Sequence, residues 1–163
     1  MKKRFEFSLQ YPKPLAEEEL KDLLEVARSG LFSRYSNSYV PELEKTLAAY
    51  YGTDHAITCT SGTAALHGAL VALDLPPGSE VVVTPVADIG VVLPVIYENL
   101  IPVFADIDPE TYNVDATTVE RVLTDLTSAV IAVHLAGNPC DLDGLRELCD
   151  AKGLPLLEDI SQA

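Results

Sequence analysis

Basic residues are scarce in this chain, and their scarcity argues against several classes of partner. The 163 residues include 25 Asp and Glu but only 11 Lys and Arg, which gives a formal net charge of −14 at pH 7. A surface with this balance repels nucleic-acid phosphates and anionic lipid headgroups. We therefore expect neither nucleic acid nor a membrane as a partner, and we interpret the acidity as a contribution to solubility.

Long hydrophobic runs and paired cysteines are also missing. No segment approaches the roughly 18 to 20 consecutive apolar residues that span a membrane, and no apolar run of signal-peptide length follows the basic start at residues 1–5. The three cysteines, Cys59, Cys140 and Cys149, form no CxxC pair. These features are typical of a cytoplasmic globular protein with reduced thiols, in which Cys59 and Cys149 pack as small hydrophobic residues.

From residue 53 onward, no linker, repeat or low-complexity tract interrupts a regular alternation of short apolar runs and helical patterns. This alternation predicts right-handed βαβ units and an α/β fold with a largely parallel sheet. Asp115 and Asp141 are candidate N-caps, and Gly153 is a candidate helix stop. The expected strands are 56–58, 81–84, 102–105, 129–133 and 154–157, and the expected helices are 64–73, 91–97, 117–123 and 142–151.

Residues 1–52 follow a different pattern and are predicted to form a helical arm ahead of an α/β domain at 53–163. A polar and aromatic loop at 32–39, which includes Tyr35, lacks any periodicity. Tyr35 is a candidate substrate-side residue. Apolar residues at helical spacing predict helices at 20–27, ended by Ser29-Gly30, and at 40–50, ended by Gly52.

A strand-to-helix turn at Ser61-Gly62-Thr63 is a candidate anion site. Glycine lets the backbone approach a ligand closely, and the free N–H groups of a helix N-terminus bind anions such as phosphate. The hydroxyls of Ser61 and Thr63 add two further donors. Because the turn matches neither a Walker loop nor GxGxxG, it does not indicate ATP or NAD. The alternative is a plain N-cap on a well-packed helix.

A second candidate site follows the expected buried strand at 154–157. Asp159 and Gln162 would lie at its carboxyl end, where ligands bind in open α/β sheets. A carboxylate here can keep a heterocycle nitrogen protonated, as pyridoxal 5′-phosphate (PLP) requires to act as an electron sink. Gln162 would hydrogen-bond the neighbouring ring oxygen. The alternative is that Asp159 only caps a helix.

Two other polar motifs carry weaker signals. His134 follows the expected strand at 129–133 and is either a residue that faces the ligand or a satisfied structural histidine. The sequence Asp106-Ile107-Asp108 resembles a metal-binding DxD motif, but it runs directly into a turn. We therefore expect no metal site in this chain.

Six motifs, taken in order, resemble one known family. They are Ser29-Gly30 with Glu42-Leu43-Glu44, then 61–66, 78–85, 102–109, 134–139 and 158–163. In this order they resemble the DegT/DnrJ/StrS family of sugar aminotransferases, which are PLP enzymes of fold type I. The resemblance covers nearly the whole chain and implies an incomplete large domain with three α-β-α layers, in a homodimer. In such a dimer the loop at 32–39 would face the partner; the alternative is a flexible surface loop.

The resemblance also implies a role for each candidate residue. The turn at 61–63, chiefly Gly62 and Thr63, would hold the PLP phosphate. Asp159 would pair with the pyridine nitrogen, and Gln162 would lie near the ring hydroxyl. Family members usually carry a ring-stacking aromatic residue after the Thr-Pro turn, whereas this chain has 86–89, Val-Ala-Asp-Ile, so Asp88 becomes the candidate cofactor-side residue.

The Schiff-base lysine of the family lies beyond the Asp-x-x-Gln motif, and all six lysines of this chain precede it. We therefore expect a PLP-dependent aminotransferase cut before this lysine, and hence inactive as a 163-residue chain. The resemblance implies that the complete enzyme transfers an amino group from an amino acid such as glutamate to a nucleotide-linked keto sugar. One alternative is a PLP-dependent sugar dehydratase of the same family, in which histidine replaces the lysine. Another is a non-catalytic ligand-binding or interaction module.

Overall fold

Residues 14–36 and 38–163 are described by the computed structural model, and the basic start of the chain lies outside them. The chain divides into two units, Met1–Thr58 and Cys59–Ala163. The expected domain boundary between residues 52 and 53 stays a prediction. In the part of the chain that the structure describes, no helix is long and apolar enough to cross a membrane.

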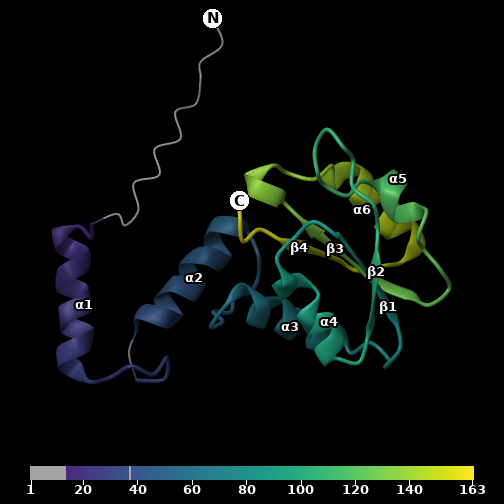
Figure 1. Ribbon diagram of the computed structural model, residues 1–163. Helices are drawn as coiled ribbons and strands as arrows, with labels where there is room; N and C mark the ends of the chain where they lie inside the picture. Colours follow the sequence, from purple (N-terminus) through teal and green to yellow (C-terminus); the bar gives the residue numbers. More distant parts are fainter. Residues whose placement is uncertain (1–13, 37) are drawn as a thin grey trace, which may run out of the picture. The chain divides into compact units, whose positions relative to one another are not determined.

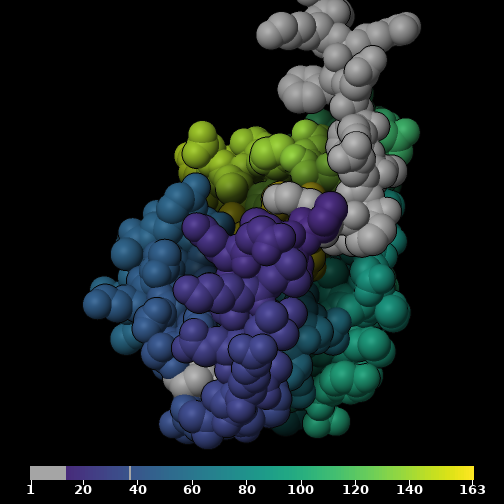
Figure 2. All heavy atoms as spheres, turned by 90° about the vertical axis from the view of Figure 1, so that its left-hand side faces the viewer, coloured from purple at the N-terminus to yellow at the C-terminus, as the bar shows by residue number. Residues whose placement is uncertain are grey.

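The first unit contains the two helices predicted from its apolar spacing. They are α1 (Glu17–Ser29) and α2 (Tyr39–Tyr51), and each ends at a glycine with positive φ, 68° at Gly30 and 67° at Gly52. Glycine adopts this left-handed conformation without steric cost, which stops each helix where the sequence predicts. Helix α1, in purple in Figure 2, keeps Leu20, Leu23 and Leu24 between 38% and 57% exposed.

The prediction of a strand at 56–58 is wrong, because the structure has no strand there. The N–H and the hydroxyl of Thr58 each donate to Glu44 Oε1 at 2.9 Å, so a side chain and not a neighbouring strand satisfies this backbone. The apolar side chain of Ile57 suggests a buried strand, but this side chain is 75% exposed. Cys59, which follows directly, is exposed and does not pack as a small hydrophobic residue.

The second unit is built on a four-stranded parallel sheet, as predicted (Figure 1). Its order is β2-β1-β3-β4, so β4 lies at one edge and is only partly buried, in contrast to the expected buried strand. The strands are β1 (Glu80–Val83), β2 (Ile101–Phe104), β3 (Thr127–Val133) and β4 (Leu156–Asp159).

Side chains of β1, β3 and β4 alternate between two hydrophobic cores, one on each side of the sheet. Val81 and Val83 belong to the core under α3 (Gly62–Leu73), whereas Val82 belongs to the core under α6 (Leu142–Lys152). The result is the predicted three-layer α-β-α arrangement. The α3 face carries α3 (Gly62–Leu73), the 3₁₀ turn η1 (Ile89–Val91) and α4 (Leu93–Tyr97), and the α6 face carries α5 (Ala116–Glu120) and α6 (Leu142–Lys152).

The predicted helix boundaries on the α6 face are confirmed at three residues. The Asp115 carboxylate accepts the Thr118 N–H at 2.8 Å, and the Asp141 carboxylate accepts the Gly144 N–H at 3.3 Å. Gly153 ends α6 with φ 67°. These caps fix where each crossover returns to the sheet, and therefore where the carboxyl ends of β3 and β4 lie together.

Candidate functional site

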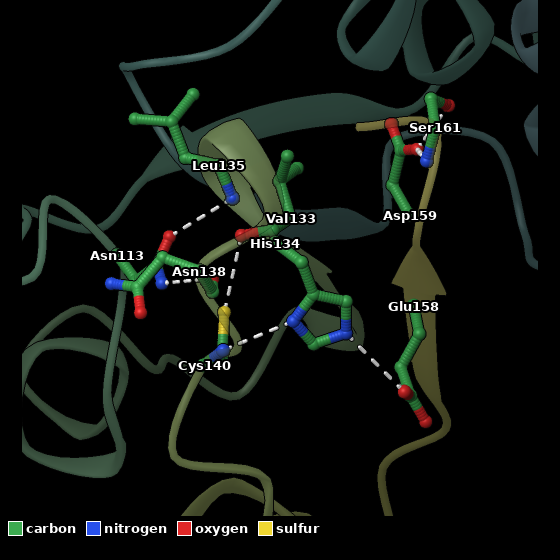
Figure 3. Close-up of polar contacts among 9 residues, drawn as sticks. All are labelled: Asn113, Val133, His134, Leu135, Asn138, Cys140, Glu158, Asp159 and Ser161. Atoms are coloured by element: carbon green, nitrogen blue, oxygen red, sulfur yellow. Dashed lines mark hydrogen bonds and ion pairs between the residues drawn. The ribbon is translucent and has the colours of Figure 1, made fainter. Parts of the chain in front are cut away.

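The end of β4 presents two neighbouring carboxylates to opposite faces of the sheet. Leu157 packs against the core on the α3 face, and Leu156 packs against the core on the α6 face. Because side chains along a strand alternate, Asp159 points to the α3 face and Glu158 to the α6 face. Figure 3 shows Glu158 directed toward His134 and Asp159 directed away from it, toward Ser161.

Asp159 lines a cavity of about 180 Å³ between the carboxyl ends of the strands and the start of α3. An adjoining cavity of about 280 Å³ shares Gly62, Asp159 and Ser161 with it. Five of the six residues predicted to bind the cofactor therefore meet in one hollow. The smaller cavity is lined by Gly62, Thr63, Asp88, Gly90, Val91, Val133, Asp159, Ser161 and Gln162.

The start of α3 offers unpaired backbone donors to this cavity. Ser61 is the N-cap: its hydroxyl accepts the Ala64 N–H at 3.1 Å, and its carbonyl accepts the Ala65 N–H at 3.0 Å. Within the described residues, the N–H groups of Gly62 and Thr63 have no acceptor. Together with the positive end of the helix dipole, they form a site for an anion. Ser61 acts here through the cap and does not line the cavity.

Asp159 is held in place at one carboxylate oxygen. Its Oδ1 accepts the Ser161 N–H at 2.9 Å and also the Ser161 hydroxyl (Figure 3). Its carbonyl accepts the His134 N–H at 3.1 Å. Oδ2 accepts no hydrogen bond from the described part of the chain. The carboxylate is thus oriented by its own turn and keeps one oxygen for a ligand. This oxygen suits a positively charged N–H donor.

Gln162 is oriented by a contact to the turn after β3. Its Oε1 accepts the Ala136 N–H at 2.7 Å. Since an N–H can only donate, this bond assigns the oxygen of the amide, and Nε2 remains as the donor. Gln162 lines the cavity, and its Nε2 is the amide donor that remains for a ligand oxygen.

Asp88 and Thr63 lie together at the η1 side of the cavity. Asp88 Oδ1 accepts the Gly90 N–H at 2.8 Å and thereby starts η1. A Cβ at Gly90 would clash with the Thr63 hydroxyl, so only glycine lets Thr63 lie here. Sequence reasoning missed Gly90 and Ser161. Their signal is modest: each lies two residues after an aspartate whose carboxylate accepts its backbone N–H.

The two remaining candidates are His134 and Tyr35. His134 is 4% exposed and does not line the cavity, because it faces the α6 side next to Cys140 and Glu158. Burial raises the pKa of the Cys140 thiol, which keeps this neighbour neutral. Tyr35 belongs to the first unit, is 92% exposed, and has the Arg34 guanidinium 5.7 Å from its ring centroid.

The carboxylates of the DxD motif are used by backbone groups. Asp106 Oδ1 accepts the Ile107 N–H at 2.9 Å, and Asp108 Oδ1 accepts the N–H groups of Glu110 and Thr111 at 2.9 Å each. These bonds lower the pKa of Asp108, chiefly through Thr111 and then Glu110. The motif therefore organises the turn that follows β2.

The three layers and the cavity define an α/β protein with the large-domain fold of the fold type I PLP enzymes. The chain belongs to the DegT/DnrJ/EryC1/StrS aminotransferase family, which it matches over residues 13–163. It is 42% identical over 125 residues to the GDP-perosamine synthase of Caulobacter vibrioides, covering 77% of this chain and 34% of that protein. It is 38% identical over 156 residues to the spore coat polysaccharide biosynthesis protein SpsC of Bacillus subtilis, covering 95% of this chain and 40% of that protein.

Solved structures agree with this membership. An aminotransferase from Psychrobacter cryohalolentis superposes with a TM-score of 0.88 at 35% identity, covering 92% of this chain and 38% of that one. The GDP-4-keto-6-deoxy-D-mannose-3-dehydratase of E. coli was solved with bound hydrated PLP. It superposes with a TM-score of 0.81 at 28% identity, covering 90% of this chain and 39% of that one. This chain thus spans between about a third and two fifths of the length of these proteins.

Proposed function

We propose that this chain forms the PLP-binding region of an aminotransferase that transfers an amino group from an amino acid to a keto sugar. The observation that carries the proposal is the cavity itself, in which Asp159, Gln162 and the free N–H groups of α3 converge. Its donors and acceptors correspond to the three polar parts of PLP: a phosphate, a ring nitrogen and a ring oxygen.

Each of these residues has a distinct task in the proposed site. The Gly62 and Thr63 N–H groups bind the phosphate, with the Thr63 hydroxyl beside them. Asp159 Oδ2 holds a proton on the ring nitrogen, while Ser161 keeps Oδ1 in place. Gln162 Nε2 donates to the ring oxygen. When bound, PLP supplies an electron sink for the carbon that carries the transferred amino group.

Asp88 distinguishes this site from one with a stacking aromatic ring. Its carboxylate lines the cavity beside Thr63, with Oδ1 already bonded to the Gly90 N–H. We assign to Asp88 the role of a polar contact on the cofactor side, where it orients the ring or the incoming amino group. Tyr35 is retained as a substrate-side candidate.

The names of two relatives support the substrate class of the proposed reaction. GDP-perosamine synthase carries a nucleotide sugar in its name, and SpsC is named for polysaccharide biosynthesis. We therefore propose a nucleotide-linked keto sugar as acceptor. We further propose an amino acid such as glutamate as donor, a homodimer as the working state, and the cytoplasm as the location.

The test uses the chain with any residues that its gene encodes beyond position 163. With PLP, ¹⁵N-labelled glutamate and a nucleotide-linked keto sugar, we expect an ¹⁵N-labelled amino sugar and 2-oxoglutarate by mass spectrometry. Asp159→Ala should lower the rate of transfer by at least about 100-fold, because the ring nitrogen loses its counter-ion. Glu158→Gln, on the other face of β4, should stay within a few-fold.

Two results would contradict the proposal. A deoxygenated sugar without ¹⁵N would identify a dehydratase, as in the E. coli relative. Equal losses for Asp159→Ala and Glu158→Gln would reduce Asp159 to a structural residue of its turn.

A further inference from the structure

On the α6 face, His134 is fully engaged in the turn that follows β3. Its Nδ1 accepts the Cys140 N–H at 3.0 Å, so the proton of the neutral ring lies on Nε2, 3.4 Å from Glu158 Oε2. The Cys140 thiol donates to the Val133 carbonyl at 3.1 Å. These bonds close residues 133–140 into a loop around a buried histidine (Figure 3).

A buried asparagine holds the same loop from the other side. Asn113 is 2% exposed, its Oδ1 accepts the Leu135 N–H at 3.2 Å, and its Nδ2 donates to the Asn138 carbonyl at 2.7 Å. The Asn138 side chain in turn donates to the Thr111 carbonyl at 3.1 Å. The loop is thus fixed at its beginning and near its end by side chains that do not line the cavity.

The loop needs this support because of the conformation at its tip. Ala136 has φ 52° and ψ 27°, a left-handed conformation that is unfavourable for a residue with a side chain, and Gly137 follows with φ 79°. In this conformation the Ala136 N–H points at Gln162 Oε1, 2.7 Å away. The Gly137 backbone also lies close to Gln162, because a Cβ at Gly137 would be 3.1 Å from the Gln162 carbonyl oxygen.

We propose that His134 is a positioning residue that acts through this loop on Gln162. By accepting the Cys140 N–H, His134 holds the strained tip at Ala136, and the tip fixes the Gln162 amide with its Nε2 toward the cavity. The assignment of a ring oxygen as the acceptor of Nε2 rests on the proposed function. The coupling from His134 to Gln162 does not, since every contact in it is present without a ligand.

The variants separate the two ring nitrogens of His134. In His134→Asn, the amide oxygen replaces Nδ1 and keeps an acceptor for Cys140. In His134→Gln, the amide reaches toward Glu158 and leaves the Cys140 N–H without its acceptor. Glu158→Gln is the matched control, because it alters the Nε2 contact alone. Far-UV circular dichroism and thermal melting establish that each variant is folded.

The first readout needs no cofactor. Amide hydrogen exchange at Ala136, measured by NMR in the 163-residue chain, should be at least about tenfold faster in His134→Gln than in the unsubstituted chain. His134→Asn and Glu158→Gln should retain protection. Unchanged exchange at Ala136 in a folded His134→Gln chain would overturn the coupling.

The second readout asks whether the coupling reaches the ligand. His134→Gln should weaken PLP binding about fivefold, the effect of one lost hydrogen bond, while binding of 3-deoxypyridoxal phosphate, which lacks the ring hydroxyl, stays within twofold. Equal weakening for both ligands would mean that His134 acts only on general stability and would contradict the positioning role. Failure of the unsubstituted chain to bind either ligand would contradict the proposed function instead, and the exchange data would still decide the role of His134.

Discussion

Aspartates in the second unit repeatedly accept backbone N–H groups from residues that follow them closely. This local contact occurs at Asp88, Asp115, Asp141 and Asp159. Such bonds start helices and turns, so part of the acidity of the chain is structural. Asp88 and Asp159 are distinguished from the other two by their place, because both line the cavity next to the start of α3.

Glu44 in the first unit gives a pH-dependent prediction. The Thr58 N–H and then the Thr58 hydroxyl lower the pKa of Glu44, burial opposes them, and Arg34 at 2.7 Å adds a smaller lowering. A carboxylate with a lowered folded pKa stabilises the fold at pH values above its ordinary 4.5, and this stabilisation is lost as the pH falls through the folded pKa. We therefore expect the Thr58 contact to persist below pH 4.5.

The Thr58 amide shift in an NMR titration checks this expectation. Its midpoint should lie below 4.5, and Glu44→Gln should remove the titration, whereas Glu42→Gln, on the same helix, should leave it. A midpoint at or above 4.5 would show that Thr58 does not hold the Glu44 carboxylate in solution.

At the scale of elements, the contact between α3 and η1 depends on a missing side chain. A Cβ at Gly90 would clash with the Thr63 hydroxyl and lie 3.0 Å from Asp88 Oδ1. Gly90→Ala should therefore lower the free energy of unfolding by about 1 to 3 kcal/mol, because η1 must move away from α3. Urea denaturation monitored by circular dichroism measures this change.

Gly68, within α3, is the matched control for Gly90. A Cβ there meets no atom within 4 Å, and alanine is a better helix former than glycine. Gly68→Ala should raise the free energy of unfolding by about 0.5 to 1 kcal/mol. If both substitutions stabilise the chain, the close contact between Gly90 and Thr63 does not exist in solution.

Elements with strong local signals could be predicted from the sequence, and elements that depend on distant partners could not. Capping aspartates and terminal glycines placed α6 within a residue or two, and apolar runs placed β1, β2 and β3. The strand expected at 56–58 failed because a carboxylate fourteen residues away binds Thr58. Nothing in residues 56–58 themselves indicates that Glu44 accepts the hydrogen bonds of Thr58.

At the scale of the whole second unit, the site draws on segments far apart in the sequence. Thr63 comes from α3, Asp88 from the loop before η1, and Asp159 and Gln162 from the end of β4. The sequence suggested these residues individually, and the parallel topology brings them together. The sequence did not indicate on which face of the sheet His134 lies, because that depends on the register of β3 beside β4.

The central claim is that one cavity holds PLP, with its phosphate at α3 and its ring nitrogen at Asp159. The most direct measurement adds PLP labelled with ¹⁵N in its ring to the 163-residue chain and follows both the ring nitrogen and the backbone amides by NMR. We predict shifts at Gly62, Thr63, Ser161 and Gln162, and a protonated ring nitrogen at a pH where free PLP has lost that proton. Asp159→Asn should abolish this protonation, and Glu158→Gln should preserve it. Amide shifts elsewhere in the chain, or a protonated ring nitrogen in Asp159→Asn, would contradict the account.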